Sequence, residues 1–164
     1  MTNITKNNGK RSLPFDEPRL VAFIQSATRN HPKLNVKEYT EKAIANITAK
    51  PEYKAEQITH LLTMLALERI DMGSPNWTYV ASYIHSRELY KQASKSRVYD
   101  AAKKYGDFYS LLTTLTDGGV YSPYLLETYS KEEIREFAGL IDSERDKLFT
   151  YIGLKTLSDR YLAR

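Results

Sequence analysis

The chain has 164 residues, and its hydrophobic share of 41% is that of a globular protein with one domain or two small units. It contains no cysteine, which excludes disulfides, thiolate nucleophiles and cysteine-ligated metal centres from this chain. The net charge of +4 and the pI near 9.1 suit an anionic partner, a nucleotide or a nucleic acid, although charge alone favours the simpler explanation of a mildly basic solvated surface.

The first predicted element is a β-hairpin. Residues 4–6 form one predicted strand, Asn7-Asn8-Gly9 the turn, and residues 10–13 the returning strand. An Asn-Gly pair favours a tight hairpin turn because both residues tolerate a positive φ.

Four helices are predicted next: one from Asp16 to a linker at residues 30–35, and the others over about 35–49, 54–72 and 74–93. Asp16 is predicted to cap the first, and Asn35-x-x-Glu38 is typical of a capping box at the start of the second. Gly73 is predicted to end the third, and Ser74 to cap the fourth. Apolar residues at helical spacing predict the core-facing positions. They are Leu20, Phe23, Ile24, Ala27, Val36, Tyr39, Ala43, Ile47, Ile58, Leu61, Leu62, Leu65, Trp77, Val80, Ala81 and Ile84.

A polar boundary is expected over residues 94–98, and only helices and turns after it. The predicted segments are a helix closed by residues 117–119, a short turn or helix over 121–129, and helices from Ser130, from about 142 to 151, and over 153–162. Phe108, Leu111, Leu112, Ile134, Phe137 and Ile141 are predicted to be their apolar positions. The last predicted helix runs almost to the end of the sequence without a tail, so we expect a piece of a longer protein. The predicted fold is mainly α, with a small N-terminal β-hairpin and four helices followed by an all-helical segment.

The start of the chain carries the pattern expected of a phosphate site. A hairpin that leads into a helix brings Lys6, Lys10 or Arg11, and Arg19 near one helix N-terminus, where free N–H groups and the positive end of the dipole favour anions. Phe15 or Leu13 is placed to contact a base, and Lys91 supplies a further cation if the fourth helix folds back. The alternative is a hairpin with solvated basic residues, since the sequence matches no standard phosphate loop.

The order Lys6, Gly9, Phe15-Asp16 and Arg19-Leu20 resembles the opening of the ATP-cone, the allosteric module at the front of many ribonucleotide reductase large subunits. The likeness continues in order through segments 74–81, 119–123, 129–133, 141–146, 149–155 and 160–162. The last five of these segments resemble the helical region that joins the cone to the catalytic barrel.

The resemblance implies binding of ATP or dATP, with or without Mg²⁺, as an allosteric effector. It also implies the following residues as the site: Lys6, Ser12, Leu13, Pro14, Phe15, Asp16, Arg19, Ala55, Thr59 and Lys91. Arg19 would be the main phosphate cation. The sequence departs from the family at Asn7-Asn8, where the family has Arg-Asp, and at Ala55 and Thr59, where it has threonine and histidine. His60 is one place off.

The resemblance also divides the chain into an ATP-cone domain at 1–93 and the helical N-terminal region of a class I type catalytic subunit at 94–164. The departures from the family leave a degenerate cone as an alternative. Reduction in this family needs cysteines in a barrel that this chain lacks, so we expect no activity from it alone. The implied partners are the catalytic remainder of the large subunit, the small radical-generating subunit, and further copies through the large subunit.

Two alternatives stay open: a structural fragment with a non-binding cone that complements a separate catalytic piece, and a basic helical nucleic-acid module. The second is less favoured because no recognition-helix signature stands out. No apolar run reaches eighteen residues and no signal peptide is visible, so we expect a cytoplasmic protein without membrane contact. The three histidines share no metal-ligand spacing, and no metal site is expected.

Overall fold

The computed structural model describes residues 2–6, 11–96 and 107–162. Contacts divide the chain into two compact units, Met1–His85 with Phe149–Lys155, and Ser86–Leu148 with Thr156–Arg164. We call these unit 1 and unit 2. Helices α4 and α8 contribute residues to both. The predicted division at residues 93 and 94 concerns function, and it stays a prediction.

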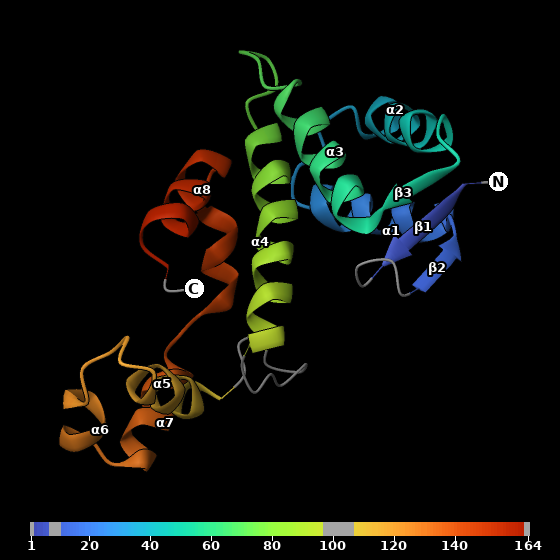
Figure 1. Cartoon of the computed structure of the whole chain (residues 1–164). Helices are drawn as coiled ribbons and strands as arrows, with labels where there is room; N and C mark the ends of the chain where they lie inside the picture. The colour runs from blue at the N-terminus through green and yellow to red at the C-terminus, as the bar shows by residue number, and fades with distance from the viewer. Residues whose placement is uncertain (1, 7–10, 97–106, 163–164) are drawn as a thin grey trace. The chain divides into compact units, whose positions relative to one another are not determined.

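Unit 1 contains a three-stranded sheet and helices packed on it (Figure 1). Its elements are β1 (Asn3–Lys6), β2 (Arg11–Pro14), α1 (Glu17–Thr28), α2 (Val36–Thr48), β3 (Glu52–Lys54), α3 (Ala55–Leu67) and the first half of α4 (Trp77–Ser96). The predicted mainly-α fold with a small β element is confirmed.

The hairpin pairs as predicted, with β1 antiparallel to β2 and Lys6 opposite Arg11. The predicted turn at Asn7-Asn8-Gly9 lies outside the described residues. The sequence analysis missed β3, which pairs parallel to β1 and makes β1 the central strand. The Thr2 hydroxyl supports this edge by donating to the Lys50 carbonyl at 2.9 Å.

The predicted caps of the first two helices form. The Asp16 carboxylate accepts from the Arg19 backbone N–H at 2.9 Å, and Asn35 accepts from the Glu38 N–H at 3.3 Å. Each bond satisfies one of the backbone donors that a helix leaves free at its first turn. The entry angle of α1 is therefore fixed by a residue that also lies at the candidate site.

Three predicted boundaries of α3 and α4 are wrong. Helix α3 ends at Leu67, five residues before the predicted end, because the chain tightens into i→i−3 bonds there, from the Arg69 N–H to the Ala66 carbonyl and from Ile70 to Leu67. Helix α4 begins at Trp77 and runs to Ser96, through three residues of the predicted polar boundary.

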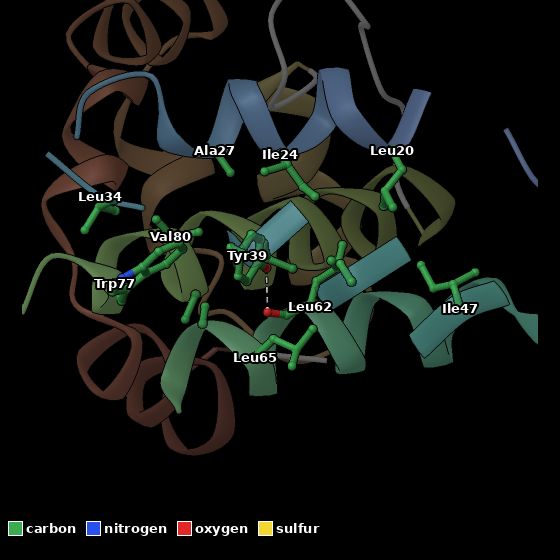
Figure 2. Close-up of a cluster of buried hydrophobic side chains, with 14 of the residues drawn as sticks. Leu20, Ile24, Ala27, Leu34, Tyr39, Ile47, Leu62, Leu65, Trp77 and Val80 are labelled. Carbon is green, nitrogen blue, oxygen red and sulfur yellow. Dashed lines mark hydrogen bonds between the residues drawn. The ribbon is translucent and has the colours of Figure 1, made fainter. Parts of the chain in front are cut away.

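The core of unit 1 lies between α1, α2, α3 and α4 (Figure 2). The predicted core-facing residues of α4 are all buried, and most of those in α1, α2 and α3 are buried as well. The Tyr39 and Trp77 rings pack at 4.8 Å, and the Arg69 guanidinium lies 5.5 Å from the centre of the Tyr39 ring. A segment distant in sequence joins this unit, since the Tyr151 N–H donates to the Thr78 hydroxyl at 3.1 Å.

Unit 2 is helical throughout the part that the structure describes. Its elements are the second half of α4, α5 (Phe108–Asp117), α6 (Tyr124–Thr128), α7 (Lys131–Gly139), the 3-10 helix η1 (Ser143–Leu148) and the second half of α8 (Tyr151–Arg160). Helix α5 packs against α7, and Leu112 and Ile134 are buried there. The predicted capping box at Ser130 forms with Glu133.

Three predictions for unit 2 are corrected. The segment after Asp142 is a short 3-10 helix rather than an α-helix reaching residue 151, since Asp142 accepts from the Glu144 N–H two residues on and the chain closes with i→i−3 bonding. Phe137 and Ile141 are exposed, because α5 covers α7 only around Ile134.

Among the described residues, no helix combines the length and the apolar character needed to cross a membrane.

Candidate functional site

A cavity of about 760 Å³ lies in unit 1 between the hairpin, the start of α1 and the first turns of α3. This volume is within the usual range for small-molecule sites. Its lining residues are Ile4, Leu13, Pro14, Phe15, Asp16, Glu17, Pro18, Arg19, Leu20, Phe23, Ala55, Ile58, Thr59 and Leu62.

The cavity brings together seven of the ten residues that the sequence analysis assigned to one site. They are Leu13, Pro14, Phe15, Asp16, Arg19, Ala55 and Thr59. They come from segments about forty residues apart in sequence, and the parallel pairing of β3 with β1 explains how they meet, because it sets the start of α3 beside the hairpin.

The other three predicted site residues are not among the described residues that line the cavity. Ser12 is exposed on β2 and does not line the cavity. The side chain of Lys6 lies outside what the structure describes. Lys91 belongs to unit 2, where its ammonium group is 3.5 Å from the Glu88 carboxylate. The proposed convergence of Lys6, Arg19 and Lys91 on one phosphate group therefore stays a prediction.

Two helix N-termini border the cavity. Asp16 to Arg19 form the start of α1, and Ala55 and Ile58 belong to the first turns of α3. A helix N-terminus attracts anions through its free N–H groups and its dipole. The N-terminus of α1 attracts a ligand anion less strongly, because the Asp16 carboxylate already accepts a hydrogen bond from the Arg19 N–H.

The described charges at the cavity are two carboxylates, Asp16 and Glu17, and the Arg19 guanidinium. Arg19 is exposed, and its guanidinium makes no ion pair with any residue that the structure describes. An exposed guanidinium without a protein partner can bind a phosphate in a bidentate manner. Arg19 is therefore the best-placed described cation for an anionic ligand.

The walls of the cavity are mainly apolar, and Phe15 and Phe23 supply aromatic surface. The polar group offered by α3 is the Thr59 hydroxyl, which donates to the Ala55 carbonyl at 3.3 Å and keeps its oxygen lone pairs for a ligand donor. An apolar slot with a few polar groups at its edges suits a planar base. His60 is exposed and does not line the cavity.

The sequence analysis missed seven lining residues, namely Ile4, Glu17, Pro18, Leu20, Phe23, Ile58 and Leu62. For α3 a signal was present. Ala55, Ile58, Thr59 and Leu62 recur at helical spacing and share one face, so naming any two of them as site residues identifies the other two.

Comparison with known proteins finds relatives for this chain, although no family model matches it. The ribonucleoside-diphosphate reductase alpha subunit of Helicobacter pylori strain 26695 is 28% identical over 165 residues, which cover 100% of this chain and 19% of the relative. The alpha subunit of Treponema pallidum is 31% identical over 134 residues, 77% of this chain and 15% of the relative. That of Enterobacteria phage T4 is 25% identical over 164 residues, 100% of this chain and 20% of the relative.

The chain is a homologue of part of the ribonucleotide reductase large subunit. It spans about a fifth or less of the length of these curated relatives, consistent with an N-terminal part of the alpha subunit. The sequence resemblance to this reductase is confirmed.

Proposed function

We propose that unit 1 binds a purine nucleotide, ATP or dATP, as the allosteric effector site of a ribonucleotide reductase large subunit. The observation that carries the proposal is the cavity, which gathers seven residues selected from sequence for this role. The relationship to reductase alpha subunits agrees with the family resemblance from which those residues were selected. Reduction of ribonucleotides to deoxyribonucleotides would take place in the remainder of the subunit.

In this proposal the base enters the apolar part of the cavity and the phosphates lie at its edge. Phe15 and Leu13 would contact the base, and Arg19 would bind the phosphates with Lys6. Two carboxylates near the phosphates, Asp16 and Glu17, make a bound Mg²⁺ useful because it offsets their repulsion of the triphosphate. ATP and dATP differ by one hydroxyl, so discrimination between them rests on about one hydrogen bond, on the order of 1 kcal/mol.

The effector would act by favouring one arrangement of the chain over another, which changes its contacts with neighbouring subunits. The proposed partners are the catalytic remainder of the large subunit, the small radical-generating subunit and further copies of the large subunit. Lys91 would join the site only with a polyphosphate between it and Arg19, since two cations otherwise repel each other. A cytoplasmic location belongs to the same proposal.

Isothermal titration of the full chain with ATP and dATP, with and without Mg²⁺, tests the proposal. We expect saturable binding and a rise in melting temperature that grows with ligand concentration. Arg19→Ala should weaken binding about tenfold or more, since charge-assisted hydrogen bonds contribute about 1.5–3 kcal/mol.

Arg29→Ala is the matched control, because Arg29 is also exposed but lies at the other end of α1, away from the cavity. It should bind as the wild type does. Equal affinity of the wild type and Arg19→Ala would refute the assignment of the pocket.

A second candidate function is a structural fragment with a cavity that binds no nucleotide. The carboxylates of Asp16 and Glu17 beside Arg19, and Ala55 in place of a hydroxyl residue, favour it. This candidate predicts no titration signal with either nucleotide.

A further inference from the structure

The apolar stripe of α7 extends beyond the helix that covers it. Helices α5 and α7 lie side by side (Figure 1), and Ile134 of α7 is 3% exposed. Phe137 lies three residues further along the same face of α7, yet it is 54% exposed, and Ile141, two residues past the end of α7, is 52% exposed. The apolar surface is therefore longer than the part that α5 covers, and the uncovered part can contact a second partner.

Four residues make up this uncovered surface, which we call the α7 patch: Tyr129, Phe137, Leu140 and Ile141. The Tyr129 and Phe137 rings pack edge to face, with centroids 6.0 Å apart. The backbone stays nearly helical past α7, since the Leu140 N–H donates to the Phe137 carbonyl at 3.0 Å, and Leu140 is 76% exposed. Contiguous exposed apolar side chains are typical of interaction surfaces, whereas single exposed apolar residues are common on any surface.

The charges of α7 divide between its two sides. Its cations already engage the α5 region, with Arg135 4.0 Å from Asp107 and the Lys131 ammonium 5.1 Å from the centre of the Tyr109 ring. Glu132 and Glu136 make no ion pair within the described ranges. Because Glu136 precedes Leu140 by one helical turn, the edge of the patch is acidic. A fitting partner is apolar at its centre and basic at its edge.

We infer that the α7 patch docks on the part of the reductase alpha subunit that lies outside the segment matched by this chain. In the relatives that match the whole chain, about four-fifths of the alpha subunit lies outside that segment, so a large protein surface is joined to it in one polypeptide. Tethering raises the local concentration of that surface, which favours it over a free partner. The inference does not depend on nucleotide binding, since the patch belongs to unit 2 and the cavity to unit 1.

A hybrid alpha subunit tests the inference. In it, this chain replaces the matched 165-residue segment of the Helicobacter pylori alpha subunit. Hydrogen exchange is measured on peptides covering residues 124–141, in the hybrid and in the free 164-residue chain. We expect exchange in these peptides to slow by on the order of tenfold or more in the hybrid, because docking suppresses local opening.

The double variant L140S/I141S identifies the side chains responsible. Both residues are exposed, so their replacement leaves the unit 2 core intact, and the added protection should be lost. Ile152→Ser is the matched control, because Ile152 is 75% exposed, nearly as much as Leu140, and lies in unit 1. It should leave the protection at 124–141 unchanged.

Several results overturn the inference: equal exchange in the hybrid and the free chain, an equal loss of protection with Ile152→Ser, or protection already present in the free chain. Sedimentation of the free chain identifies a second copy as the occupant if it dimerises through these residues. The same hybrid built on the phage T4 alpha subunit provides a second host. If the wild-type chain gains no protection at residues 124–141 in either hybrid, the inference fails as well.

Discussion

The Tyr39 phenol donates a hydrogen bond of 2.7 Å to the backbone carbonyl of Leu62, from the first turn of α2 to the middle of α3 (Figure 2). Both residues belong to the core of unit 1, and the Leu62 side chain also lines the cavity. The bond therefore fixes the helix that forms one wall of the candidate site.

Tyr39→Phe removes this hydrogen bond and keeps the ring. We expect the free energy of unfolding to fall by about 1 kcal/mol, the usual contribution of one buried hydrogen bond. Urea denaturation of the full chain measures the change. Tyr53→Phe is the control, because Tyr53 is buried and its ring, 5.2 Å below the Lys50 ammonium, is kept. A loss for Tyr53→Phe as large as that for Tyr39→Phe would contradict the assignment.

The same tyrosine predicts a loss of stability at alkaline pH. Burial raises the pKa of the Tyr39 phenol well above its ordinary value of 10.0, and the positive charge of Arg69 opposes this shift only in part. Above about pH 10 the unfolded chain loses this proton while the folded chain keeps it, so stability falls as pH rises, by at most about 1.4 kcal/mol per pH unit. Below that pH both states keep the proton and the contribution is constant.

Unfolding of the wild type and Tyr39→Phe at about pH 9 and about pH 11 measures this effect. The advantage of the wild type should shrink at the higher pH. An advantage that stays constant would show that Tyr39 titrates at the same pH in both states.

The sequence predicts the helices of unit 1 well because their signals are local. A capping side chain and an apolar stripe at helical spacing are both readable within a few residues, as at Asp16 and across α4. Strand β3 gives no such signal. Its three residues follow Pro51, and they become a strand only because β1 offers a free edge about fifty residues earlier in the chain.

The residues of the candidate site are also predicted only in part, because some of their contacts involve segments distant in sequence. Family resemblance supplies residues on the hairpin and on α3, and the structure places most of them around one cavity. The apolar lining is harder to select from sequence, because Leu20 and Leu62 read as ordinary core residues and do belong to the core. Likewise, Phe137 fits a core pattern, but local spacing cannot tell whether a second helix covers it.

Two substitutions of Asp16 distinguish its role as the cap of α1 from the effect of its negative charge on the cavity. Asp16→Ala removes the cap of α1 and should lower the stability by about 1 kcal/mol. Asp16→Asn keeps a capping oxygen, so its stability should match that of the wild type. The same change removes a negative charge from the cavity and should tighten the binding of ATP.

Thermal unfolding and titration calorimetry measure the two effects. Glu41→Gln is the charge-matched control, since Glu41 lies exposed on α2 beside Lys37 and away from the cavity. Weaker ATP binding by Asp16→Asn would mean that this carboxylate accepts a hydrogen bond from the ligand.

Ala55→Thr tests whether the departure from the family at this position limits binding. Ala55 lines the cavity at the first residue of α3, and a hydroxyl there gains access to the ligand. One added hydrogen bond of about 1 kcal/mol tightens the binding of ATP by roughly fivefold. The control is Ala45→Thr, on an exposed position of α2 that does not line the cavity. If titration detects ATP binding to neither variant nor the wild type, a missing hydroxyl is not what prevents binding, and the structural role becomes the better account of unit 1.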